Sequence, residues 1–290
     1  MTAQKHVKET NCDENCTPCS QGPSTHAPQG LPPRSKIDVK HVILVLSGKG
    51  GVGKSTVSVN LASALSAHGR MVGLLDLDIH GPNIPKMLGI EDQRPSVLAK
   101  VLEPVHVTGK LAVMSMAFLL PDTSTPVVWR GPMKMAVIQQ FLDEVNWGSL
   151  DYLVVDLPPG TGDEALTIAQ LAPNLRGAVI VTTPQDVAVL DAVKAIKFIE
   201  KLEIPVIGII ENMSGMCCPH CGETVDLFGR GGGERAAHDL GVPYLGAIPL
   251  DPAMVKACDE GRPYILHHAD SPTWRAVDTV MENLVKVVES

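Results

Sequence analysis

Short apolar runs alternate with segments of helical periodicity along most of the chain. The runs that we interpret as buried strands are residues 42–46, 72–75, 111–117, 152–156, 178–183, 206–211 and 244–248. Apolar positions three or four residues apart predict helices at 57–67, 133–145, 187–202, 234–240 and 274–288. This alternation is typical of an α/β fold, so we predict a mostly parallel sheet with helices on both faces.

Two regions do not fit that pattern. Residues 1–36 are polar and rich in proline, and we interpret them as a flexible arm that contains cysteines. Residues 91–110 have no sustained period and are expected to be a variable excursion. With 290 residues and 44% apolar composition, the chain can bury one substantial core, which we assign to residues 37–290.

A phosphate-binding loop follows the first predicted strand. Residues 48–55 fit the pattern G-x-x-x-x-G-K-[ST], and a helical segment comes directly after them. Glycines let successive backbone N–H groups face one anion, and the helix N-terminus adds its dipole. The sequence therefore predicts a P-loop NTPase whose nucleotide-binding candidates are Gly48, Lys49, Gly50, Gly51, Val52, Gly53, Lys54, Ser55 and Thr56.

A second lysine, Lys49, lies inside this loop and gives it the form K-G-G-x-G-K-[ST]. On this motif the chain resembles the MinD, ParA and nitrogenase iron-protein class. The resemblance implies that Lys49 reaches across a dimer interface to the nucleotide of the other subunit. We therefore predict that Lys49 and Lys54 both act in catalysis, and that the chain forms a homodimer.

Acidic residues end two of the predicted strands. Asp76 and Asp78 follow residues 72–75, and Asp156 ends residues 152–156. Ligands bind at the carboxyl edge of open α/β sheets, so these carboxylates are expected beside the phosphates. Asp156 fits a Walker B residue that holds Mg²⁺ together with Ser55, and Asp76 is a further candidate for the magnesium shell.

Two more roles follow from the resemblance and from the next turn. In this class the second aspartate of D-x-D positions the attacking water, which implies that Asp78 is the general base or orients that water. The alternative for Asp76 and Asp78 is helix capping. The turn DLPPGTGD contains Gly160, whose N–H is expected to approach the γ-phosphate.

Asn212 corresponds to the residue that contacts the adenine edge in this class, although a simple turn asparagine is the alternative. It follows the strand predicted at 206–211. Residues 249–252, after the last predicted strand, are candidates for the wall of the base pocket.

Six of the seven cysteines form two clusters. Cys12, Cys16 and Cys19 have the spacing C-x3-C-x2-C and are candidate ligands of one metal centre, with a fourth ligand from His26, a partner or a second copy. Cys218 and Cys221 form a C-x2-C knuckle within residues 213–228. Four thiolates would suit a tetrahedral zinc ion or a 4Fe-4S cluster, and a two-fold dimer supplies them.

The chain closely resembles the Mrp/ApbC family of iron-sulfur carrier ATPases. The motifs GKGGVGKST, DLDIHGPNIP, DLPPGTGD and ENMSGMCCPHCG carry this resemblance over about residues 38–288. It implies that Cys218 and Cys221 of each subunit hold a bridging, labile 4Fe-4S cluster. Some family scaffolds also bind an N-terminal cluster through four cysteines at a wider spacing than Cys12, Cys16 and Cys19.

The composition of the chain argues against some classes of binding partner. A net charge of −8 and 3% aromatic residues argue against nonspecific binding of nucleic acid. The polar N-terminus and the lack of any long apolar run indicate neither a signal peptide nor a membrane span, so we predict a cytoplasmic protein. The C-terminal segment carries too few basic residues for an anionic membrane and is expected to pack on the sheet.

The leading hypothesis is a homodimeric ATPase of slow turnover that uses ATP and Mg²⁺. It would bind a 4Fe-4S cluster and pass it to apo iron-sulfur proteins, without nucleic acid or membrane as a partner. Two alternatives stay open: a ParA- or MinD-like partitioning or positioning ATPase, and a nucleotide switch stabilised by zinc at the same knuckle.

Overall fold

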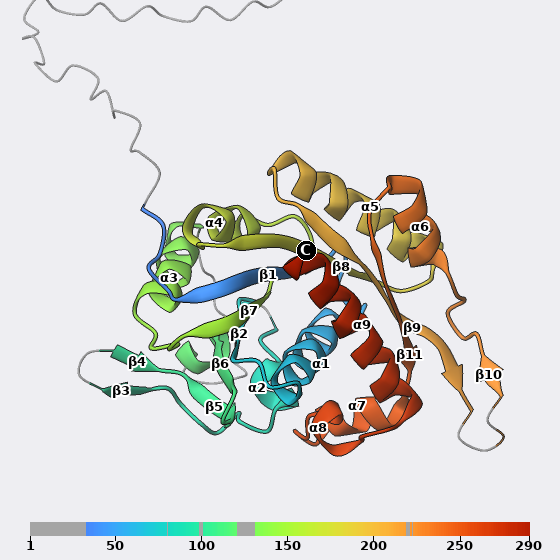
Figure 1. Cartoon of the computed structure of the whole chain (residues 1–290), viewed down its shortest axis with the longest axis horizontal. Coiled ribbons are helices and arrows are strands. Elements are labelled where there is room, and N and C mark those ends of the chain that lie inside the picture. Colours follow the sequence, from blue (N-terminus) through green and yellow to red (C-terminus); the bar gives the residue numbers. More distant parts are fainter. Residues whose placement is uncertain (1–32, 80, 99–100, 121–130, 219–220, 222) are drawn as a thin grey trace, which may run out of the picture. The chain divides into compact units, whose positions relative to one another are not determined.

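A mostly parallel, nine-stranded sheet runs through the computed structural model (Figure 1), with β11 joined to β9 beside the strand path β10-β9-β8-β1-β7-β2-β6-β5. The structure describes residues 33–290 except 80, 99–100, 121–130, 219–220 and 222. A separate two-stranded sheet contains β3 and β4. The strands are β1 (Val39–Ser47), β2 (Val72–Asp76), β3 (Ser96–Leu98), β4 (Val101–Glu103), β5 (Val105–Thr108), β6 (Leu111–Ser115), β7 (Leu150–Asp156), β8 (Leu175–Thr182), β9 (Val206–Cys217), β10 (Thr224–Val225) and β11 (Tyr244–Leu250).

The central strand β1 lies between β7 and β8 and is parallel to both. Val45 pairs with Asp156 on one side and with Val179 on the other. The runs that form these strands are almost wholly apolar because both faces of the sheet are covered. Antiparallel pairing occurs in the described main sheet where β5 meets β6 and where β10 meets β9.

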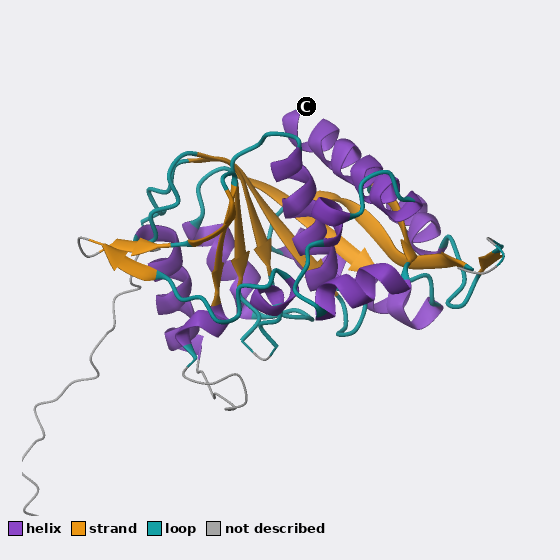
Figure 2. Cartoon of the chain, turned by 90° about the horizontal axis from the view of Figure 1, so that it is seen from below, coloured by secondary structure: helices purple, strands orange, loops and turns teal. Residues whose placement is uncertain are grey.

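Helices cover both faces of the sheet (Figure 2), as the alternating pattern predicted. One buried cluster joins the sheet to α1, α2, α7, α8 and α9. The other joins it to α3, α4, α5 and α6. The helices are α1 (Lys54–Ala67), α2 (Ile84–Met87), α3 (Gly131–Asp143), α4 (Asp163–Leu171), α5 (Asp186–Lys201), α6 (Gly232–Leu240), α7 (Pro252–Asp259), α8 (Tyr264–His267) and α9 (Pro272–Glu289), with a 3-10 turn at Met116–Leu119.

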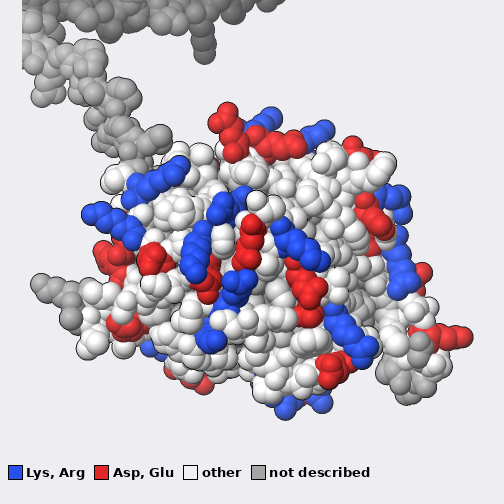
Figure 3. Space-filling view, in the orientation of Figure 1, with Lys and Arg blue, Asp and Glu red and all other residues white. Residues whose placement is uncertain are grey.

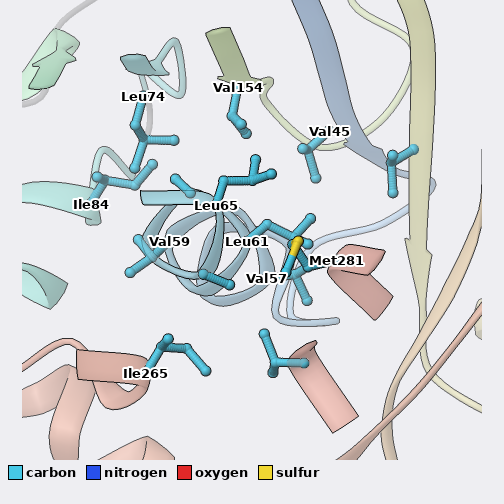
Figure 4. Packing of buried hydrophobic residues seen from close by; sticks show 14 of the residues in the cluster. Val45, Val57, Val59, Leu61, Leu65, Leu74, Ile84, Val154, Ile265 and Met281 are labelled. Carbon is cyan, nitrogen blue, oxygen red and sulfur yellow. The ribbon is translucent and has the colours of Figure 1, made fainter. Parts of the chain in front are cut away.

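Helix α1 is buried on nearly all sides, which is expected of a helix that is apolar or small around its whole circumference. Figure 4 shows Leu61 and Leu65 between the strand residues Val154 and Leu74 and the helices that cover this face. Both leucines are about 1% exposed. Burying each is worth about 1.5–3 kcal/mol, so the core fixes α1 and the loop that precedes it.

The structure differs from the sequence predictions in several elements. The excursion at 91–110 contains β3, β4 and β5, and the elements α2, α4, α7, α8 and β10 were not predicted. Strand β9 continues past residue 211 to Cys217, because β11 and β10 pair with its second half. The C-terminal helix α9 packs against β11 and β9, as expected. No helix within the described ranges is both long enough and apolar enough to cross a bilayer.

Candidate functional site

The phosphate loop connects β1 to α1 and has the backbone that its glycines predicted. Gly51 and Gly53 adopt left-handed conformations, with φ of +81° and +80°. Gly53 is the N-cap of α1, and no side chain caps this helix end. First-turn N–H groups of such a helix are available to an anion. Gly48 is required for another reason: a Cβ there would lie 2.1 Å from the carbonyl oxygen of Asp191 in α5.

A buried polar cluster lies directly beneath the loop. The Lys54 ammonium is 2.6 Å from Asp156 Oδ2, and the two side chains are 6% and 0% exposed. Ser55 Oγ donates to the same carboxylate oxygen at 2.7 Å, and Ser58 Oγ donates to Oδ1 at 2.6 Å. The structure thus brings together the predicted lysine, hydroxyl and Walker B acid.

Ser58 was not predicted as part of this site. It lies three residues after Ser55 on the same face of α1, a spacing that brings both hydroxyls towards one neighbour. That spacing was the available signal, but only the packing of α1 on β7 shows that Asp156 is the shared acceptor.

Asp76 lies beside Asp156 because the two residues pair across β2 and β7. Its carboxylate accepts a hydrogen bond from Ser115 Oγ at 2.8 Å and one from the Asp78 N–H at 3.1 Å. Burial, followed by repulsion from Asp156, raises the pKa of Asp76 to about 8, although these hydrogen bonds and Lys54 oppose the shift. Two neighbouring buried carboxylates favour a bound proton or cation between them.

The remaining catalytic candidates border this cluster. Asp78 is 9% exposed, and its Oδ1 accepts a hydrogen bond from the Gly81 N–H. Lys49 is half-buried, and its carbonyl accepts from Ser47 Oγ at 2.9 Å. The Gly160 N–H donates to the Ser47 carbonyl at 2.9 Å, so a contact with a γ-phosphate would require this hydrogen bond to open.

The loop after Asp156 leads into α4, whose first turn is anchored by an ion pair. Glu164 is 4% exposed, and its carboxylate lies 2.7 Å from the Lys134 ammonium of α3. The other carboxylate oxygen folds back over Gly162, where an added Cβ would lie 2.1 Å from it. The pair therefore holds the end of the loop that contains Gly160.

A cavity of about 180 Å³ opens beside the phosphate loop. Its wall contains Asn212 and, of residues 249–252 predicted for the base pocket, residues 249–251. Asn212 lies within β9, and its Nδ2 donates to the Val52 carbonyl at 2.9 Å. The lining residues are Thr56, Met87, Asn212, Met213, Pro249, Leu250, Asp251, Met254, Val255, Cys258 and Asp259.

The C-x2-C knuckle lies at the turn of a hairpin formed by β9 and β10, which extends at one edge of the sheet (Figures 1 and 2). Cys217 pairs with Thr224, and the Cys218 N–H donates to the Glu223 carbonyl at 2.8 Å. Cys217 and Cys221 are exposed and Cys218 is half-buried. The hairpin therefore presents thiols to solvent.

The N-terminal cysteines are the remaining metal-ligand candidates. Cys12, Cys16 and Cys19 lie outside the described residues. Within the described ranges of this single chain, no three His, Cys, Asp or Glu side chains are grouped as a metal site.

The surface charge is mixed. On the face shown in Figure 3, Lys and Arg side chains are interspersed with Asp and Glu. That face therefore has no continuous basic area of the kind that binds a nucleic acid backbone.

Comparison with known proteins identifies the family of this chain. Residues 38–285 match a family described as NUBPL iron-transfer P-loop NTPase. An iron-sulfur cluster carrier protein of Methanocaldococcus jannaschii is 50% identical over 96% of this chain and 98% of its own length. The cytosolic Fe-S cluster assembly factor CFD1 of Kluyveromyces lactis is also 50% identical, over 79% of this chain and 83% of its own.

Solved structures agree with this assignment. A nucleotide-binding protein of Archaeoglobus fulgidus in complex with ADP has a TM-score of 0.70 and 41% identity, over 82% of this chain and 91% of that one. The MinD cell division protein of Aquifex aeolicus, with a TM-score of 0.60 and 24% identity over 85% of this chain and 97% of its own, shares the fold. The family match over residues 38–285, together with relatives about 50% identical over most of the chain, shows that the chain belongs to the family of NUBPL-type iron-transfer P-loop NTPases.

Proposed function

We propose that this chain is an ATP-hydrolysing carrier that binds a labile 4Fe-4S cluster between two identical subunits and transfers it to apo iron-sulfur proteins. The observation that carries the proposal is the cysteine hairpin, because it presents Cys218 and Cys221 directly after β9, the strand whose Asn212 contacts the phosphate loop. Carrier and assembly names among relatives about 50% identical support it.

The nucleotide site fits ATP with Mg²⁺. An uncapped helix N-terminus and two left-handed glycines provide donors for phosphate oxygens. Ser55 and Asp156 would hold Mg²⁺, with Asp76 in the shell around it, and Asn212 and Thr56 would lie beside the base and sugar. Bound Mg²⁺ would neutralise charge that develops on the phosphates.

In the hydrolysis step, Lys54 would leave Asp156 and bind the β- and γ-phosphates. Asp78 would orient the attacking water, and Lys49 would contribute its charge to the nucleotide of the partner subunit. Gly160 would exchange its bond to Ser47 for the γ-phosphate. Catalysis by positioning and charge is expected for phosphoryl transfer.

The cluster is cargo. Cys218 and Cys221 of two subunits would supply 2 × 2 = 4 thiolates around a centre on the two-fold axis. Cys221 is exposed and Cys218 is half-buried, so a cluster held by this hairpin could be taken up and handed on at the surface. Cys12, Cys16 and Cys19 are proposed ligands of a separate centre. We place the protein in the cytoplasm, with no nucleic acid or membrane as partner.

Anaerobic reconstitution with iron and sulfide tests the cargo. The expected product is a brown dimer that contains iron and sulfide, absorbs visible light and holds its cluster at the hairpin. The double variant Cys218→Ala, Cys221→Ala should lose this cluster, whereas Cys217→Ala, which removes a neighbouring exposed thiol, should keep it. A full, transferable cluster in the double variant would contradict the ligand assignment, and a colourless zinc protein would favour the nucleotide switch.

Phosphate release tests the nucleotide site. Lys54→Ala should reduce hydrolysis by about a hundredfold or more, because both charge and positioning are lost. Normal hydrolysis by this variant would contradict the assignment of the loop.

A further inference from the structure

Strand β9 connects the nucleotide site to the cysteine hairpin without an intervening loop. Asn212 contacts the phosphate loop, and Cys217 and Cys218 lie at the start of the hairpin turn. The six residue steps from Asn212 to Cys218 span at most about 20 Å in an extended strand. A displacement at one end therefore has a short covalent route to the other.

The nucleotide end of this route is in tight contact with the loop. Besides its hydrogen bond to Val52, the Asn212 side chain lies so close to Gly53 that a Cβ there would be 2.2 Å from its Nδ2. Asn212 and Met213 also line the 180 Å³ cavity beside Thr56. Phosphates in the loop and a base in the cavity would thus both meet this part of β9.

The middle of the route is a bulge. Ile248 of β11 pairs with Asn212, and Leu250 pairs with Met216, so three residues of β9 lie opposite one residue of β11. Within the bulge, Met213 has φ of +58° and Gly215 has φ of +68°. Bulges redirect a strand and often lie next to functional sites.

The hairpin end is tied to the same bulge. The Arg230 guanidinium lies against Gly215, where a Cβ would be 2.7 Å from Nε, and it pairs with Asp226 at 3.0 Å. Ser214 Oγ donates to Glu211 at 2.5 Å. The Glu211 carboxylate also accepts the Gly231 and Gly233 N–H groups at the start of α6. Residues that follow the hairpin, namely Asp226, Arg230 and the start of α6, are therefore linked by contacts to the bulge.

We propose that the bulge Met213–Gly215 is a positioning segment that changes the presentation of the hairpin thiols when the nucleotide site is filled. This inference rests on the proposed function, since it concerns the thiols assigned to the cluster. Nucleotide shifts Asn212 and Met213, Gly215 absorbs the change in backbone angles, and the hairpin turns with it. Binding energy at one site is in this way converted into a different ligand geometry at the other.

Thiol alkylation of the full-length, cluster-free protein tests the coupling. Iodoacetamide labelling of the peptide containing Cys217, Cys218 and Cys221 is followed by mass spectrometry, with and without Mg²⁺ and a non-hydrolysable ATP analogue. In the unmodified chain the analogue should change the labelling rate by about fivefold or more. In Gly215→Ala the ratio should fall to one, while the affinity for the analogue stays within about twofold.

A matched control uses another left-handed glycine. Gly241, the C-cap of α6, has φ of +66° and no atoms within 4 Å of an added Cβ. Gly241→Ala therefore introduces a similar backbone strain at a position outside β9 and the hairpin. This variant should keep the ratio of labelling rates of the unmodified chain. If Gly215→Ala does not fold, Arg230→Ala releases the same contact and should also reduce the ratio.

Two results would overturn the coupling: equal labelling with and without the analogue in the unmodified chain, or a full ratio in a folded, analogue-binding Gly215→Ala protein. Failure of the proposed function looks different. If the chain never holds a cluster but the analogue still changes thiol labelling in a way that depends on Gly215, the coupling is supported. Only the proposal that the chain carries a 4Fe-4S cluster is then contradicted.

Discussion

Asp76 should make the stability of the metal-free protein depend on pH. Its pKa in the folded chain is raised from 3.8 to about 8 by burial and by the neighbouring Asp156. Between those values the folded chain holds a proton that the unfolded chain has lost. The contribution of this group to the free energy of unfolding is therefore largest below about pH 4, and it decreases as the pH rises towards 8.

The size of the effect follows from the same two values. At Asp76 the folded chain binds about one proton more than the unfolded chain at pH 6 and about half a proton more at pH 8. Summed over this interval, the difference corresponds to a loss of about 2 kcal/mol. Asn in place of Asp76 has similar shape and no titration, and its oxygen can still accept from Ser115. Asp76→Asn should therefore remove most of this loss.

Urea unfolding with EDTA, without nucleotide and at constant ionic strength, measures the difference at pH 6 and pH 8. Asp151→Asn is the matched control: hydrogen bonds from Lys40 and from the Met71 N–H lower the pKa of Asp151, so this carboxylate does not titrate in that window. The control should keep the pH slope of the unmodified chain. An equal slope in Asp76→Asn would refute the assignment of the raised pKa to Asp76.

Three further predictions concern the nucleotide site. Lys134→Ala removes the partner of buried Glu164. Phosphate-release kinetics should show kcat lowered about tenfold, with KM changed less than about threefold. Exchanging the charges of Lys134 and Glu164 in a double variant should partly restore kcat. Gly48→Ala places a Cβ 2.1 Å from the Asp191 carbonyl and should weaken ATP binding at least about tenfold in calorimetry; unchanged affinity would contradict the close packing. Cys258 lines the cavity, so ATP should slow its alkylation, as mass spectrometry of its peptide would reveal.

The phosphate loop and the strand-end acids could be predicted because strict local spacing defines them. Residues 48–55 follow an apolar run, and Asp156 ends another. Parallel strands bring such ends to one edge of a sheet whatever the rest of the chain does. The sequence thereby predicted that Lys54, Ser55 and Asp156 would lie near one another.

What could not be predicted depends on tertiary pairing. The second half of β9 reads N-M-S-G-M-C, in which polar residues and a glycine give no strand pattern, and it is extended because β10 and β11 pair with it. The three-residue strands β3 and β4 are too short to show a period. Ser58 acquires its role only when α1 packs beside Asp156.

The position of β1 between β7 and β8 has a consequence for biosynthesis. When β1 leaves the ribosome, both of its hydrogen-bonding neighbours are still untranslated, and the wait for β7 lasts roughly 5 to 20 seconds at ordinary rates of elongation. During that time an apolar strand has open edges that invite aggregation. Nucleotide cannot protect such a nascent chain, because Asp156 has not yet been added, so we expect molecular chaperones to shield β1 until translation has passed β8.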